Sequence, residues 1–173
     1  MTRPQLLDRQ RVEDIATQLA PRFGVQPNDR EAIADVVEVS LNSPYEDEYR
    51  KARALEGRGW DCDRSTLEAF EALDDQLRMA HRAAVRSWVA QCNIQPHLEV
   101  GAAVEVVRQR KPHAGVIVEI NPTDACYLVR IPEQGHVPSG QNGVQGWRVP
   151  FEELHDIVAD PSDFRLTAPP GEL

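Results

Sequence analysis

The sequence predicts an α+β fold in which a bundle of three to four helices is followed by a small β-barrel. Two successive patterns of apolar residues indicate this order. Up to about residue 92, apolar residues recur with the three-four spacing of amphipathic helices. After residue 96, apolar residues alternate with others, as they do in half-buried strands. We therefore expect a helical domain over residues 1–96, a five-stranded barrel over residues 97–160 and a tail over residues 161–173.

Two amphipathic helices are predicted near the N-terminus. The first covers about residues 4–19, and Pro21 and Gly24 end it. The second begins after Asn28 or Asp29, because either side chain can cap the free amide groups of the first turn. The residues expected on the buried faces are Val12, Ile15, Ala16 and Leu19 in the first helix, and Ile33, Val36, Val37 and Leu41 in the second.

A short polar helix is predicted over residues 45–55 and a long one over residues 66–92. The long helix begins at a capping box, in which Ser65 and Glu68 each accept a hydrogen bond from a backbone amide. Its apolar face is expected to contain Phe70, Leu73, Leu77, Ala80, Ala84 and Trp88. A helix of this length, about 40 Å, can form the spine of the helical domain.

The charged residues of the long helix are ordered along it. Acidic residues crowd its first half and arginines its second half, an order that suits the helix dipole. The residues are Glu68, Glu71, Asp74 and Asp75, followed by Arg78, Arg82 and Arg86. We interpret the arginines as a solvated face that pairs with nearby carboxylates; the alternative is that they bind an acidic partner.

Short strands are predicted around residues 104–106, 116–120, 127–131 and 147–149. The intervening turns are expected at Pro112 with Gly115 and at Asn121 with Pro122. Residues 133–146 form a long loop in this prediction, and "PFEELHD" forms a helical turn that closes the barrel.

The segments "VGAAVEVVRQRKPHAGVIVEI", "YLVRI" and "VPFEELH" together resemble an SH3-like or KOW-like small barrel. Such barrels serve as protein-binding, RNA-binding and subunit-docking modules. The resemblance therefore implies binding rather than chemistry.

Composition limits the classes of function. The chain carries 28 acidic and 19 basic residues, a net charge of −9, which opposes attraction to a phosphate backbone and makes DNA an unfavourable partner. A content of 41% hydrophobic residues is typical of a soluble globular protein. The N-terminus lacks a signal-peptide pattern, and the sequence lacks an apolar run long enough to span a membrane. We expect a cytoplasmic protein, without membrane association, whose three cysteines are free thiols.

The sequence contains no specific motif for catalysis or metal binding. The five histidines are isolated, without the spacing of metal ligands, and the sequence lacks glycine patterns typical of nucleotide sites. Cys62 precedes a helix, but Asp61 and Asp63 disfavour its thiolate. We therefore predict a protein that is not an enzyme and holds neither a cofactor nor a metal.

The predicted binding surface is a basic turn of the barrel with nearby aromatic residues. It comprises Arg108, Arg110, Lys111, His113, Tyr127, Trp147 and Arg148. The tyrosine or tryptophan ring would supply a stacking face. A solvated hairpin turn is the alternative interpretation, because lysine and arginine commonly occupy exposed turns.

The predicted function is a binding or adaptor protein, of bacterial or mobile-element origin, that acts through this barrel. Its partner is expected to be another protein, with RNA as a second candidate. Two further hypotheses stay open. One is an acidic inhibitor of a nucleic-acid-binding machine, which the net charge of −9 and the small size favour; Glu46, Asp47 and Glu48 could imitate phosphates, but we interpret them as a solvated first turn of a helix. The other is an accessory subunit of an enzyme complex. The sequence leaves the oligomeric state open.

Overall fold

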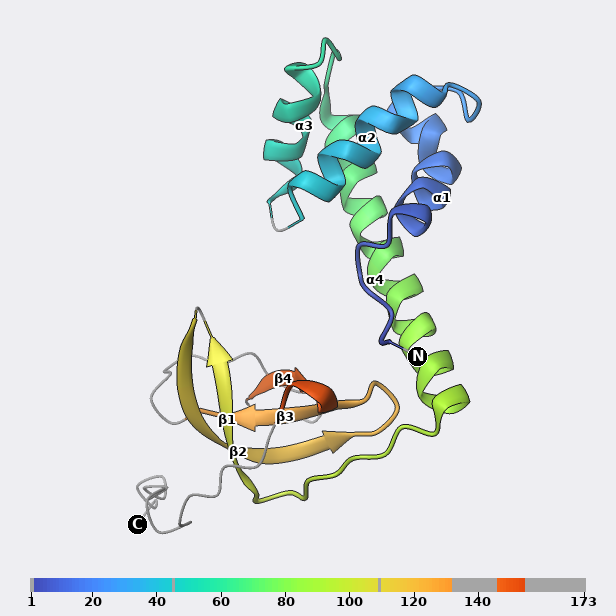
Figure 1. Ribbon diagram of the computed structural model, residues 1–173. Helices are drawn as coiled ribbons and strands as arrows, with labels where there is room; N and C mark the ends of the chain where they lie inside the picture. The colour runs from blue at the N-terminus through green and yellow to red at the C-terminus, as the bar shows by residue number, and fades with distance from the viewer. Residues whose placement is uncertain (1, 45, 109, 132–145, 155–173) are drawn as a thin grey trace, which may run out of the picture. The chain divides into compact units, whose positions relative to one another are not determined.

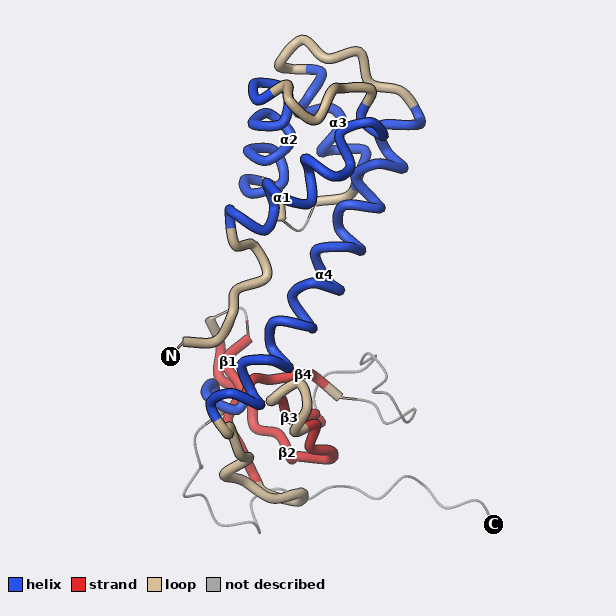
Figure 2. Tube along the Cα trace, turned by 90° about the vertical axis from the view of Figure 1, so that its right-hand side faces the viewer, coloured by secondary structure: helices blue, strands red, loops and turns tan. Residues whose placement is uncertain are grey.

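The computed structural model describes residues 2–44, 46–108, 110–131 and 146–154. Four α-helices precede a four-stranded antiparallel sheet, so the fold is α+β (Figure 1). The chain divides into two compact units, Met1–Val85 and Arg86–Leu173, with the division inside the last helix. Figure 2 distinguishes the helices, in blue, from the strands, in red.

The first two helices begin where an aspartate caps them. Helix α1 (Arg9–Leu19) starts after Asp8, whose carboxylate accepts a hydrogen bond from the Arg11 amide at 3.0 Å. The prediction that this helix starts near residue 4 is therefore wrong. A short 3₁₀ helix, η1 (Ala20–Phe23), follows and ends at Gly24, whose φ is 73°. Helix α2 (Arg30–Asn42) starts after Asp29, as the sequence predicted.

Helix α3 (Glu48–Glu56) starts after Asp47, which caps it, and is shifted from the range predicted. Helix α4 (Arg64–Cys92) also starts earlier than expected. Its cap is Asp63, whose carboxylate accepts from the amides of Ser65 and Thr66. The Ser65–Glu68 capping box is wrong, because an aspartate two residues upstream already satisfies these amides.

The helical unit has a single continuous core. Phe23 and Phe70 pack edge to face with their ring centroids 5.1 Å apart. The predicted apolar faces of α1, α2 and the first half of α4 are buried in this core, while Leu41 and Ala80 are only partly buried. One charged side chain is also buried. Lys51 is 1% exposed, and its Nζ donates to both carboxylate oxygens of Asp74, at 2.8 and 2.7 Å.

The sheet contains β1 (Ala103–Arg108), β2 (Lys111–Asn121), β3 (Cys126–Arg130) and β4 (Trp147–Pro150), in that order. A 3₁₀ turn, η2 (Phe151–Glu153), follows β4 where a helical turn was expected. Among the described residues the sheet has four strands, with β1 and β4 at its two edges. The predicted tail, and the predicted loop except Gly146, lie outside the described residues. Within the residues described, no helix combines the length and apolar character needed to cross a membrane.

The turn between β1 and β2 is not where the sequence placed it. Arg108 pairs with Lys111, so the turn lies between them, and Pro112 and Gly115 belong to strand β2. Gly115 instead allows the side chain of Val129 to approach the backbone of β2 closely. A Cβ atom there would lie 2.6 Å from Val129 Cγ1, too close for a side chain. The predicted turn at Asn121 and Pro122 is confirmed, because β2 ends at Asn121 and the Asn121 Oδ1 accepts from the Asp124 amide at 3.0 Å.

Strand β3 is buried on both faces rather than on alternate residues. Cys126, Tyr127, Leu128 and Val129 all lie below 9% exposure. Tyr127 packs on Phe151, with ring centroids 4.4 Å apart. A strand enclosed in this way forms the centre of the second unit.

Candidate functional site: the β1–β2 hairpin

The turn end of the β1–β2 hairpin extends beyond strand β3 (Figure 1). Strand β2 pairs with β3 only from Val116 onward, where Val116 lies opposite Arg130. Residues 111–115 of β2 therefore have β1 as their partner among the described residues. We call residues 105–114 the hairpin arm.

The hairpin arm has two different faces. Residues directly opposite each other in an antiparallel pair share a face, and Val106 lies opposite His113. The buried face of β1 thus continues along the arm to His113 and Lys111. On the other face, Val107 is 67% exposed, and Pro112 and Ala114 beside it are exposed as well. The arm therefore offers a basic face and a second face on which the exposed Glu105 accompanies these apolar residues.

The outer edge of β1 carries backbone groups directed away from β2. Pro112 has no N–H group, so its pair with Val107 cannot be a hydrogen-bonded one. Hydrogen-bonded and non-hydrogen-bonded pairs alternate in an antiparallel ladder. The amides of Glu105 and Val107 therefore point to the edge of the sheet, where no further strand pairs among the described residues.

Arg110 occupies the turn with a left-handed backbone, at a φ of 64°. Glycine and asparagine adopt this conformation most readily, and a long side chain adopts it at a cost. Both Arg110 and Lys111 are exposed, and neither forms an ion pair within the described part of the chain. The arm is a local basic site on an acidic protein.

The structure brings together only part of the predicted binding surface. Arg110, Lys111 and the half-buried His113 lie on the arm, where the backbone of Arg108 also belongs. The stacking role expected for Tyr127 is wrong, because this side chain is 0% exposed. Its hydroxyl accepts hydrogen bonds from the amides of His97 and Leu98, both at 3.0 Å.

Trp147 and Arg148 also lie apart from the arm. Half-buried Trp147 is paired with Val129 in the body of the sheet. Arg148 lies 3.7 Å from the carboxylate of Asp124, which also accepts from Arg86 at 3.2 Å. Asp124 thus joins the end of α4 to strand β4. Sequence reasoning missed this residue, although the phrase "NPTD" contains the asparagine turn that orients it.

Several of the remaining charged candidates pair within the fold. Arg78 lies 3.6 Å from Asp75, as the solvated-face interpretation expects, but Asp74 is bound by Lys51. The proposed phosphate mimic is also engaged. Asp47 caps α3, and Glu46 lies 3.9 Å from Arg50.

The most prominent reactive group of the sequence, the Cys62 thiol, is poorly placed to act as a nucleophile. Burial, followed by the charge of Glu56, raises the pKa of the Cys62 thiol, so the thiol stays protonated near neutral pH. Among the residues described, no group of three histidine, cysteine or acidic side chains could hold a metal ion. A hollow of about 340 Å³ lies between α1 and α2, and the arginine at its rim, Arg9, is bound by Glu38.

Comparison with known proteins adds no relative: no family model matches this chain, and no curated protein or solved structure matches it.

Proposed function

We propose that this chain is a non-enzymatic binding module, with an SH3-like sheet unit, and that its hairpin arm binds an acidic, extended segment of another protein. The observation that carries the proposal is the left-handed backbone conformation of Arg110. An exposed arginine occupies a strained backbone position at the tip of an arm, where glycine would be accommodated more easily. Strain kept at an exposed position favours a role for the side chain itself.

The other left-handed residues support this interpretation by contrast. Asn93, at a φ of 49°, is a residue type that tolerates the conformation. Ala125, at 47°, is 0% exposed, so its methyl group contributes to packing. Neither explanation applies to Arg110, which is exposed and has a long charged side chain.

The edge of β1 suggests how a partner would bind. An extended segment can add to this edge through the outward amides of Glu105 and Val107. Carboxylates of the segment that reach the turn would meet Arg110 and Lys111, while its apolar residues would cover Val107. A segment that alternates acidic and apolar residues has both properties.

A protein segment fits the arm better than RNA does. Single-stranded RNA is bound largely by stacking its bases on aromatic side chains. The arm sequence, from Glu105 to Ala114, contains no Phe, Tyr or Trp, its one ring, that of His113, is half-buried, and Tyr127 is buried. Among the described side chains of the arm, the exposed Arg110 and Lys111 supply charge, and no exposed aromatic ring accompanies them.

The experiment is a fluorescence-anisotropy titration with a labelled peptide of about ten residues that alternates glutamate and valine, run beside a single-stranded RNA probe of similar charge. We expect the peptide to bind and the variant Arg110→Glu/Lys111→Glu to lose at least about tenfold in affinity. The matched control, Arg22→Glu/Arg30→Glu, changes net charge equally on the helical unit and should bind as the parent does. Equal binding by both variants, or binding of RNA in place of the peptide, would contradict the proposal.

A further inference from the structure

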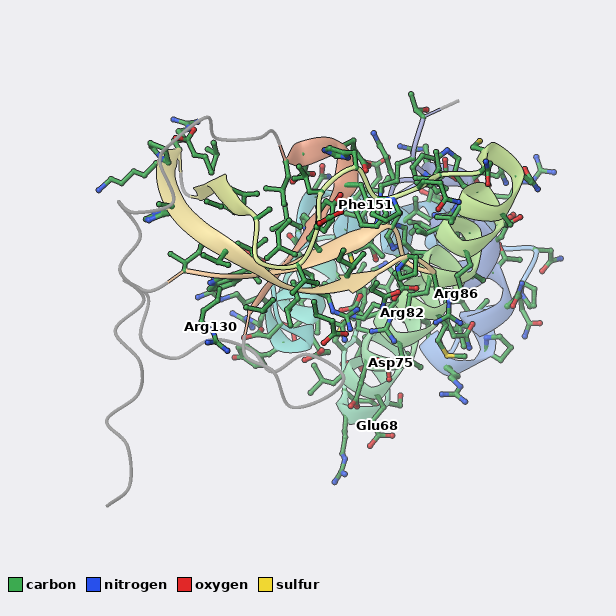
Figure 3. All side chains as sticks on the ribbon, turned by 90° about the horizontal axis from the view of Figure 1, so that it is seen from below. Glu68, Asp75, Arg82, Arg86, Arg130 and Phe151 are labelled. Atoms are coloured by element: carbon green, nitrogen blue, oxygen red, sulfur yellow. The ribbon has the colours of Figure 1, made fainter. Side chains whose placement is uncertain are left out.

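The exposed face of α4 carries charged residues that are separated by sign along the helix. The function proposed for the hairpin arm does not involve them. It consists of Glu71, Asp75, Arg78, Met79 and Arg82, which we call the α4 stripe, and all five residues are exposed. Met79, near its middle, is 70% exposed. Asp75 and Arg82, from its two charged halves, are labelled in Figure 3. The stripe is acidic toward the start of the helix and basic toward its end.

The helix dipole does not account for this order, contrary to the expectation from the sequence. The dipole acts on charges in the first and last turns of a helix. Helix α4 has no acidic residue in its first turn and no basic residue in its last turn. The change of sign lies between Asp75 and Arg78, near the middle of the 29-residue helix.

Pairing within the helix does not account for it either. Glu71 and Asp75 are four residues apart, as are Arg78 and Arg82, and like charges at this spacing destabilise a helix. The stripe contains one internal ion pair, Asp75 with Arg78 at 3.6 Å. Glu71 and Arg82 have no ion pair within the described residues. A sequence that only stabilised its own helix would alternate these signs.

We infer that the α4 stripe is an interface for a second copy of this chain, packed with its α4 antiparallel. A two-fold axis between Gln76 and Leu77 places Glu71 opposite Arg82 of the second copy, because each lies about 8 Å from the axis along the helix. The same axis places Asp75 opposite Arg78 of the second copy. Each charge of one copy then faces the opposite charge of the other.

Met79 adds an apolar contact to this arrangement. It lies about 4 Å along the helix from the axis, so the methionines of the two copies lie on either side of the centre of the interface. Exposed ion pairs contribute little each and are screened by salt. The dimer is therefore weak, and it dissociates as salt is added.

The test is sedimentation equilibrium of the full chain up to about 1 mM, at low and high salt. Glu71→Arg sets arginines against each other at both ends of the interface, and Arg82→Glu sets glutamates against each other there. We expect each to raise the dimer dissociation constant at least about tenfold. The combined variant, Glu71→Arg/Arg82→Glu, exchanges the partners and should restore association to within about threefold of the parent.

Glu13→Arg and Arg22→Glu are matched controls, because they change the net charge equally at exposed positions outside the α4 stripe. Circular dichroism verifies that each variant is folded. A parent chain that stays monomeric at about 1 mM in low salt overturns the inference, and so does a combined variant that associates no better than the single ones. The variant Arg110→Glu/Lys111→Glu should dimerise normally, which separates this interface from the hairpin arm.

Discussion

Helix α3 and the hairpin arm use their basic residues in opposite ways. Within the described residues, every basic side chain of α3 has a carboxylate partner; the pairs are Lys51–Asp74, Arg50–Glu46 and Arg53–Glu56. Arg110 and Lys111 of the arm have none in the same part of the chain. Charge in α3 therefore serves the fold, whereas charge in the arm is available to a partner. Substitutions in α3 should change stability, and substitutions in the arm should change binding.

The largest effect is expected at Lys51. Lys51→Ala should lower the free energy of unfolding by about 3 kcal/mol, because it leaves the Asp74 carboxylate, 19% exposed, without its counter-charge. Arg53→Ala, which removes an exposed pair from the same helix, should cost less than about 1 kcal/mol. Urea unfolding measures both. Similar losses for the two variants would remove the distinction between buried and exposed charge in α3.

The next largest loss of stability is expected in the body of the sheet, at Tyr127. Tyr127→Phe should cost about 2 kcal/mol, because the amide of buried Leu98 and the amide of His97 lose their common acceptor. Tyr49→Phe is the control, since Tyr49 is 63% exposed. Thermal unfolding followed by circular dichroism compares them. An unchanged melting temperature for Tyr127→Phe would show that this hydroxyl does not hold the segment in place.

A smaller effect depends on pH. Burial, and then the charges of Arg11, Arg3 and Arg82, lower the pKa of His81 below its ordinary 6.5. The folded state thus binds the proton less well than the unfolded state does. The stability that His81 contributes is present above pH 6.5 and is lost as the pH falls toward its folded-state pKa.

We therefore expect His81→Gln to lose less stability than the parent between about pH 7 and pH 5. Urea unfolding at the two pH values measures the difference. The same loss in both proteins would show that another group is responsible for the acid sensitivity.

The sequence predicts some features of the helical unit better than others. The spacing of apolar residues placed the cores of α1, α2 and α4 correctly, because an amphipathic helix must bury one face whatever it packs against. Helix starts were less certain, since several capping residues compete within a few positions. Asp63 displaces Ser65 for this reason.

The sheet was harder to predict because its glycine and proline residues have unexpected roles. Gly115 allows Val129 to approach, and Pro112 occupies a position that needs no amide, so neither marks the turn. The basic residues of the arm could be recognised as an exposed cluster from the sequence. The burial of Tyr127 and the binding of Arg148 by Asp124 depend on contacts between distant parts of the chain, which local patterns do not contain.

The smallest effect on stability is expected at the tip of the arm. Arg110→Gly relieves the left-handed backbone but makes the unfolded chain more flexible, so the free energy of unfolding should change by less than about 1 kcal/mol. Binding of the acidic peptide should nevertheless weaken, because a charge that faces the partner is removed. Chemical denaturation and peptide titration of one sample measure both quantities. A large loss of stability without a loss of binding would reverse the proposed roles of the two regions.

Amide hydrogen exchange, measured by NMR with and without the acidic peptide, tests the central claim most directly. The amides of Glu105 and Val107 point to the edge of β1, which pairs with no further strand of the described residues, whereas those of Val104 and Val106 already bond to β2 and act as internal controls. We predict that the peptide slows exchange at Glu105 and Val107 and leaves the two controls nearly unchanged. A peptide that binds while these edge amides exchange at their original rates would contradict the account.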